Sequence, residues 1–176
     1  MSNVKSQHVW QEIVLFTAFG LYIIILLVLL FGKASSTQSV NLIPFHTITD
    51  YFSRERPLGL SNVIGNVLLF IPLGVFLSLF TRSKKLWLTV LSIALISASA
   101  EVLQYSIHIG AADIDDVILN IMGGLVGIAL YHGLHKAFKE KTRWAIGLIS
   151  LGVGILFLFI VICLWTGVFG IRIRII

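Results

Sequence analysis

Charged residues are scarce in this sequence. Only 12% of its 176 residues are charged, whereas soluble domains average about 25%. Hydrophobic residues make up 57% of the chain, and this balance excludes an ordinary soluble domain. The formal net charge of +5 does not indicate a nucleic-acid partner, because the basic residues lie in short loops between apolar runs.

Cysteine is almost absent, and the few acidic residues follow no metal-binding pattern. The single cysteine, Cys163, excludes an internal disulfide. No cysteine pair or His-x-x-x-His spacing offers a zinc site, and the run from Asp113 to Asp116 lacks the spacing of a calcium loop. Phosphate loops, nucleotide fingerprints and Ser-His-Asp spacings are also missing. We therefore expect no metal and no cofactor.

Long apolar runs dominate the chain instead. Each of five runs is close to or above the roughly 18 residues that cross a bilayer as a helix. We predict an all-α membrane protein with one domain, residues 1–176, and five transmembrane helices. The predicted spans are residues 13–31, 63–80, 86–107, 117–134 and 144–165.

The loop charges predict the orientation of these helices. Loops 81–85 and 135–143 carry seven lysines and arginines, whereas the turn 108–116 carries none. Because cytoplasmic loops are enriched in positive charge, we place the N-terminus inside and the C-terminus outside. The long connection 32–62 is then also outside, although it contains Lys33, Arg54 and Arg56.

Polar side chains gather near the predicted outer ends of three spans. Glu101 and Gln104 lie in the third span, Asn66 in the second, and Asp116 and Asn120 begin the fourth. A carboxylate inside a membrane helix costs about 2.5–3.5 kcal/mol on insertion scales, so it needs partners or a wet cavity. We interpret these residues as a polar pocket that is open to the outside.

Four segments in this order resemble the VanZ family. They are Asn41-Leu-Ile-Pro-Phe45, Gly65-Asn-Val-Leu-Leu-Phe-Ile-Pro-Leu-Gly74, Glu101-Val-Leu-Gln104 and Asp113-Ile-Asp-Asp-Val-Ile-Leu-Asn120, the last followed by Gly123. The resemblance covers about residues 41–134. It implies a small multi-pass protein of the bacterial cytoplasmic membrane and cell envelope. The founding member of the family is associated with low-level resistance to the glycopeptide teicoplanin.

One position departs from the family pattern. Many members carry an arginine just after the glycine that opens the acidic motif, where this chain has Ala111. If that arginine pairs with the aspartates, this chain must balance them in another way. The candidates are Lys33, Arg54, Arg56, His46 and His108.

The candidate pocket residues have two readings each, one functional and one structural. Glu101 and Gln104 form an acid/base or ligand-binding pair, or a hydrogen-bonded plug between helices. Asp113 or Asp115 caps the fourth span, and Asp116 has a site role or none. Interhelical hydrogen bonding is favoured for Asn66 and Asn120. The full candidate set is Asn41, His46, Asn66, Glu101, Gln104, Asp113, Asp116 and Asn120.

Two further expectations concern geometry. Residues 41–46 should fold back over the outer mouth of the pocket, because Leu42 and Phe45 need cover. Glu101 should be at least partly protonated and should face Asn66 and Asn120 rather than lipid, because desolvation favours the neutral acid.

Two classes of function fit this reading. The first is a binding protein for membrane lipids, a lipid-linked cell-wall precursor or a glycopeptide. The second is an enzyme that acts on a lipid-linked envelope substrate, with Glu101 or Asp116 as acid/base. The sequence leaves both open.

Overall fold

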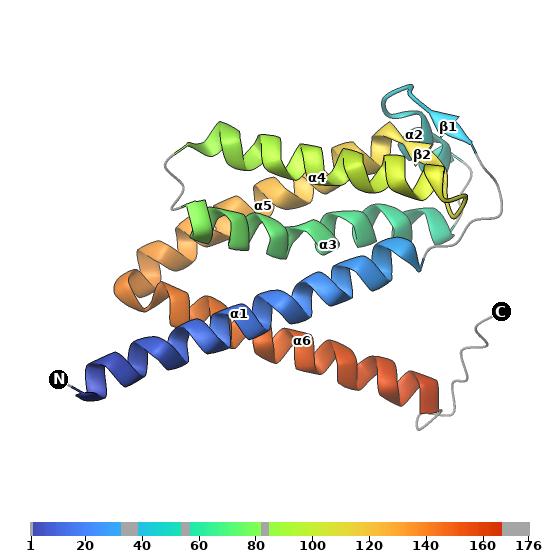
Figure 1. The fold of residues 1–176 in the computed structure, drawn as a ribbon. Coiled ribbons are helices and arrows are strands. Elements are labelled where there is room, and N and C mark those ends of the chain that lie inside the picture. The colour runs from blue at the N-terminus through green and yellow to red at the C-terminus, as the bar shows by residue number, and fades with distance from the viewer. Residues whose placement is uncertain (1, 33–38, 54–56, 82–84, 167–176) are drawn as a thin grey trace. The chain divides into compact units, whose positions relative to one another are not determined.

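The computed structural model describes residues 2–32, 39–53, 57–81 and 85–166 (Figure 1). Their contacts divide the chain into two units. One holds residues 1–24 and 138–176, and the other holds residues 25–137. The expectation of one domain over residues 1–176 remains a prediction.

Five long helices correspond to the five predicted spans. They are α1 (Ser2–Phe31), α3 (Pro57–Thr81), α4 (Leu86–Ser106), α5 (Ile114–Phe138) and α6 (Thr142–Thr166). The prediction of an all-α protein is confirmed. Four segments are long and apolar enough to cross a membrane: Gln7–Phe31, Asn62–Thr81, Leu86–Ser106 and Ile114–Cys163. The last segment contains both α5 and α6, which the 3-10 turn η1 (Lys139–Lys141) joins.

Large apolar side chains are exposed in the middle of these helices. Leu68 of α3, Leu95 of α4 and Val153 of α6 are examples. Soluble proteins rarely expose apolar patches of this extent. The exposed faces are consistent with a membrane protein whose helices contact lipid.

Glycines set the distance between α3 and α5 in the larger unit. A Cβ atom added at Gly123 would collide with the Val67 carbonyl, and one at Gly127 would collide with the Ile71 carbonyl. Gly74 of α3 meets the backbone of Gly124 in the same way. Small residues at such positions let two membrane helices pack backbone to backbone. This close contact brings the polar residues of α3 and α5 into one layer.

The smaller unit is held by α6 and the first part of α1. Gly147 of α6 lies against Val14 and Leu15 of α1, and Leu15 is fully buried. At one end, the Arg143 guanidinium donates two hydrogen bonds to the Glu12 carboxylate, at 2.9 and 2.6 Å. Because this pairing is bidentate, it fixes the geometry as well as the charge balance.

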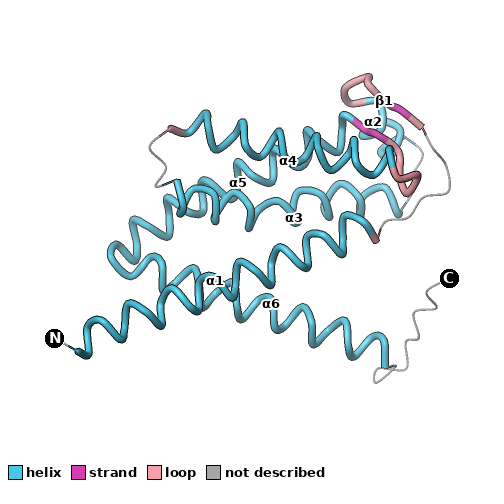
Figure 2. The backbone as a smooth tube through the Cα atoms, in the orientation of Figure 1, coloured by secondary structure: helices cyan, strands magenta, loops and turns pink. Residues whose placement is uncertain are grey.

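The connection between α1 and α3 contains structure that the span pattern does not predict. Strand β1 (Val40–Asn41) pairs in parallel with β2 (Ala112–Asp113), with Asn41 opposite Asp113. Helix α2 (His46–Ser53) follows directly. Figure 2 shows the two strands side by side near the end of α4 and the start of α5. We call residues 39–53, which include β1 and α2, the strap.

Candidate functional site

Asp115 holds the start of α2, although it belongs to the first turn of α5. Its side chain is 0% exposed. One carboxylate oxygen accepts the backbone N–H of Phe45, and the other accepts those of Thr47 at 2.8 Å and Ile48 at 3.1 Å. The first amides of a helix have no partner within the helix, and they carry a partial positive charge. Asp115 therefore caps α2 from another element, and the three amides compensate for its burial.

Asp113 joins the strap to α5. Its Oδ1 accepts hydrogen bonds from the Asn41 amide at 3.0 Å and from the Asp115 backbone N–H at 2.9 Å. Its Oδ2 accepts the Thr47 hydroxyl at 2.6 Å. The bond to Asp115 is an N-cap of α5, so the prediction of Asp113 as a cap is confirmed. The same side chain also fixes the strap.

Glu101 reaches this network from α4. It is 7% exposed, and its Oε2 accepts the Asp113 backbone N–H at 3.2 Å. An acidic side chain of one helix thus lies against the loop that begins the next. Glu101 faces protein rather than lipid, as predicted. The hydrogen bond with Asp113 was not predicted, and the expected approach of Glu101 to Asn66 and Asn120 stays a prediction.

A second polar layer lies within the helices. The Asn120 amide nitrogen donates to the Ser97 hydroxyl at 2.9 Å, which links α5 to α4. Asn66 of α3 is buried as well. Asn62, one turn earlier in α3, donates to Asp116 at 3.4 Å. The prediction that Asn120 makes an interhelical hydrogen bond is confirmed, with Ser97 as the partner.

Two predicted pocket residues make contacts that the sequence does not indicate. Gln104 is buried, but its amide nitrogen donates to the Leu30 carbonyl at the end of α1, at 2.8 Å. It was expected to pair with Glu101 on its own helix face. His46 is the exposed first residue of α2, and its contribution to the strap is made by its backbone: its N–H donates to the Ile43 carbonyl at 3.3 Å. Both residues stabilise the surrounding structure by these contacts.

The strap folds back onto the acidic turn, and its expected place over the mouth of a pocket stays a prediction. Leu42 and Phe45 were expected to be covered, and both are exposed. Polar contacts hold the segment instead: the pairing of β1 with β2, and the hydrogen bonds that Asp113 and Asp115 accept.

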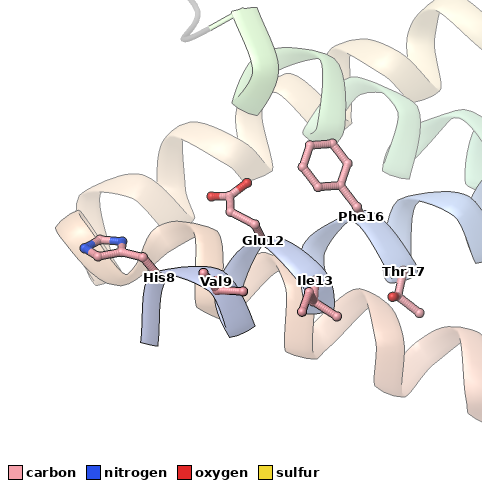
Figure 3. A pocket seen from close by; sticks show the side chains of 6 residues that line it. All are labelled: His8, Val9, Glu12, Ile13, Phe16 and Thr17. Atoms are coloured by element: carbon pink, nitrogen blue, oxygen red, sulfur yellow. The ribbon is translucent and has the colours of Figure 1, made fainter. Parts of the chain in front are cut away.

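A groove of about 700 Å³ lies along one face of α1 (Figure 3). None of its lining residues belongs to the predicted pocket. They are His8, Val9, Glu12, Ile13, Phe16 and Thr17. Within the part of the chain that the structure describes, no group of three His, Cys, Asp or Glu side chains is placed to hold a metal ion.

Comparisons with known proteins agree with the sequence motifs. The family model described as VanZ/LLP1 matches residues 19–139, which is more than half of the chain. The chain belongs to the VanZ/LLP1 family. It is also 36% identical over 104 residues to Protein VanZ of Enterococcus faecium. The matched part makes up 59% of this chain and 59% of that protein. No solved structure matches this chain.

The VanZ/LLP1 match includes the acidic motif, in which this chain has Ala111 in place of an arginine. In the described residues, Asp113 and Asp115 are balanced by backbone N–H groups, the Asn41 amide and the Thr47 hydroxyl. His108 is exposed, and its ring contacts the Ser106 carbonyl. Lys33, Arg54 and Arg56 lie outside the described residues, as do Arg82 and Lys84 of the first basic loop.

Three residues of the site were not in the predicted set: Thr47, Ser97 and Asp115. One signal could have indicated Asp115. Helix α2 begins after Phe45, which has no side-chain acceptor for the first amides of the helix. A helix that lacks its own cap needs an acceptor from another segment. The choice among nearby aspartates required the fold.

Proposed function

We propose that this VanZ/LLP1 protein binds a lipid-linked or lipid-tailed ligand of the bacterial cell envelope at the carboxylate site. We define this site as Glu101, Asp113 and Asp115 together with the strap. Through this binding it contributes to resistance to glycopeptides such as teicoplanin. The observation that carries the proposal is Glu101, a 7% exposed carboxylate in a helix long enough to span a membrane, in contact with the strap through Asp113.

The hydrogen bonds divide the acidic residues by role. Asp115 accepts three backbone amides, and Asp113 accepts two side chains and one amide. These acceptors are engaged by the protein, which favours a structural role for both residues. Glu101 belongs to α4, and its side chain contacts the Asp113 backbone. A buried acidic group in a membrane helix is costly to keep without a use, and this supports Glu101 as the residue that recognises the ligand.

The proposal includes a topology. Five spans cross the cytoplasmic membrane, with the N-terminus inside and the C-terminus outside. The charge difference between the basic loops and the turn 108–116 supports this orientation. The break between α5 and α6 at η1 supports counting them as two spans. The carboxylate site then faces the outer side, where lipid-linked cell-wall precursors and glycopeptides meet.

Substitutions at Glu101 test the site. Glu101→Gln keeps an oxygen that can accept the Asp113 N–H, so we expect normal insertion and folding but weakened binding. Glu101→Leu removes the acceptor of the Asp113 N–H, and a donor that loses its partner costs about 1–3 kcal/mol. We expect this variant to lose both stability and binding. The measurement is binding of teicoplanin to purified protein in lipid nanodiscs, together with teicoplanin resistance of cells.

Two controls make the result specific. Glu140→Gln is the same chemical change at an exposed position, and it should bind like the parent. Teicoplanin without its acyl chain should bind less tightly to the parent protein if the lipid tail is recognised. Parental binding and resistance in Glu101→Leu would refute the proposal.

The enzyme alternative remains a prediction without a specific supporting observation. It would be established by turnover of a lipid-linked precursor that Glu101→Gln abolishes.

A further inference from the structure

A run of exposed apolar side chains follows β1. Leu42 is 73% exposed, Ile43 65% and Phe45 57%, and Pro44 between them is exposed as well. Residues 40–48 contain no Asp, Glu, Lys or Arg. We call residues 42–45 the apolar turn. An uncharged apolar group of this density on a protein surface marks an interaction site.

Hydrogen bonds to Asn41 and Asp115 hold the backbone of the apolar turn. The Ile43 N–H donates to the Asn41 side-chain oxygen at 3.1 Å, and the Phe45 N–H donates to Asp115. On either side, β1 is paired with β2, and the first amides of α2 are bound by Asp115. These contacts hold the backbone of the turn, while the side chains of Leu42, Ile43 and Phe45 remain exposed.

Phe45 adds an independent observation. Its φ angle is 64°, a left-handed conformation that glycine adopts freely and bulky residues rarely adopt. Glycine would satisfy the backbone here without strain. A large exposed aromatic side chain in this position therefore indicates that the ring itself has a use.

The location of the turn identifies what covers it. β2 lies between the end of α4 at Ser106 and the start of α5 at Ile114. Both helices belong to segments that are long and apolar enough to cross a membrane. β1 is paired with it, so the apolar turn lies level with the ends of these helices. That level is the interface between lipid and water, where amphipathic segments bury apolar side chains among acyl chains.

We propose that the apolar turn inserts into the bilayer interface and anchors the strap over the carboxylate site. Its occupant is membrane lipid, namely the acyl chains next to the ends of α4 and α5. The bilayer is always adjacent to these helices, so it covers the turn without a separate binding event. This inference rests on the membrane-spanning arrangement proposed above.

Spin labels measure the surroundings of the turn directly. Single cysteines are placed at Leu42 and at Ile43 in a Cys163→Ser background, labelled, and studied in phospholipid nanodiscs. Collision rates with oxygen, which concentrates in lipid, are compared with those of a water-soluble nickel chelate. Leu95→Cys, at an exposed position within α4, is the lipid reference, and Glu140→Cys, in η1, is the water reference.

We expect the ratio of oxygen to nickel collisions at Leu42 and Ile43 to resemble that at Leu95. Ratios like that at Glu140 would place the turn in water and overturn the inference, while the spans stand. Labels shielded from both reagents would mean that protein covers the turn, which also overturns it. A water-like ratio at Leu95 itself would refute the spanning arrangement as well.

Phe45→Gly supplies a second test. Glycine removes the backbone strain and the ring together, so the strap should still fold onto Asp115. The label at Leu42 should nevertheless become more accessible to the nickel chelate. An unchanged accessibility at Leu42 would show that the ring does not contribute to insertion.

Discussion

At the scale of single residues, Asp115 fixes the position of the strap by its hydrogen bonds. It is fully buried, and its negative charge is compensated by three amides at the start of α2. A carboxylate can accept at both oxygens, whereas an asparagine side chain has only one acceptor oxygen. The start of α2 should therefore be sensitive to replacement of Asp115 by asparagine, although the two side chains have almost the same volume.

Asp115→Asn should loosen the start of α2. In either orientation the amide places an NH₂ group against at least one backbone donor, and each buried donor left without a partner costs about 1–3 kcal/mol. We expect faster hydrogen–deuterium exchange of the amides of Phe45, Thr47 and Ile48. Asp116→Asn is the matched control, because the described contact of Asp116 is with Asn62 on α3. Equal exchange in both variants would contradict the capping role.

Individual residues were predictable where one residue fulfils a local rule. Asp113 was a candidate cap because it precedes an apolar helix, and Asn120 because an amide in a membrane helix seeks a partner. The hydrogen bond from Gln104 to the Leu30 carbonyl was not predicted, since helix periodicity cannot show that this carbonyl lies within reach. The partners of a polar side chain depend on tertiary contacts, and those lie outside what sequence spacing describes.

At the scale of elements, the long helices follow directly from the apolar runs, and the strap does not. Each predicted span lies within one helix or overruns its end by a single residue. β1 and β2 have two residues each, too short for any periodicity to appear. Their pairing depends on the approach of segments that are about seventy residues apart in the chain.

The contact between α3 and α5 can be tested with a pair of alanine substitutions. Gly127→Ala places a methyl group against the Ile71 carbonyl, and overpacking of this kind costs about 1–3 kcal/mol. Gly133→Ala is the control in the same helix, because a Cβ there meets no atom within 4 Å. We expect a lower midpoint of thermal unfolding for Gly127→Ala in detergent. Gly133→Ala should match or exceed the parent, since alanine favours the helix by about 1 kcal/mol.

At the scale of the whole molecule, the number of membrane crossings depends on the longest apolar segment. Four segments qualify by length and composition, and one of them, Ile114–Cys163, holds 50 residues. A continuous helix of that length would measure about 75 Å, more than twice the roughly 30 Å hydrocarbon core. The structure interrupts the segment at η1, between α5 and α6. This interruption supports the proposal that the segment crosses the membrane twice.

Five crossings place the two ends of the chain on opposite sides of the membrane, whereas four place them on the same side. Reporter domains that are active only in the cytoplasm, fused separately to the N-terminus and to the C-terminus, distinguish these cases. We expect activity from the N-terminal fusion alone. Activity from both would contradict the predicted position of the C-terminus.

Single cysteines test the orientation. They replace His108 and Glu140, both exposed, in a Cys163→Ser background. A membrane-impermeant maleimide should label the cysteine at position 108 in intact cells and leave the one at position 140 unlabelled. The reverse pattern would place the carboxylate site on the cytoplasmic side, where a glycopeptide that acts from outside could not reach it.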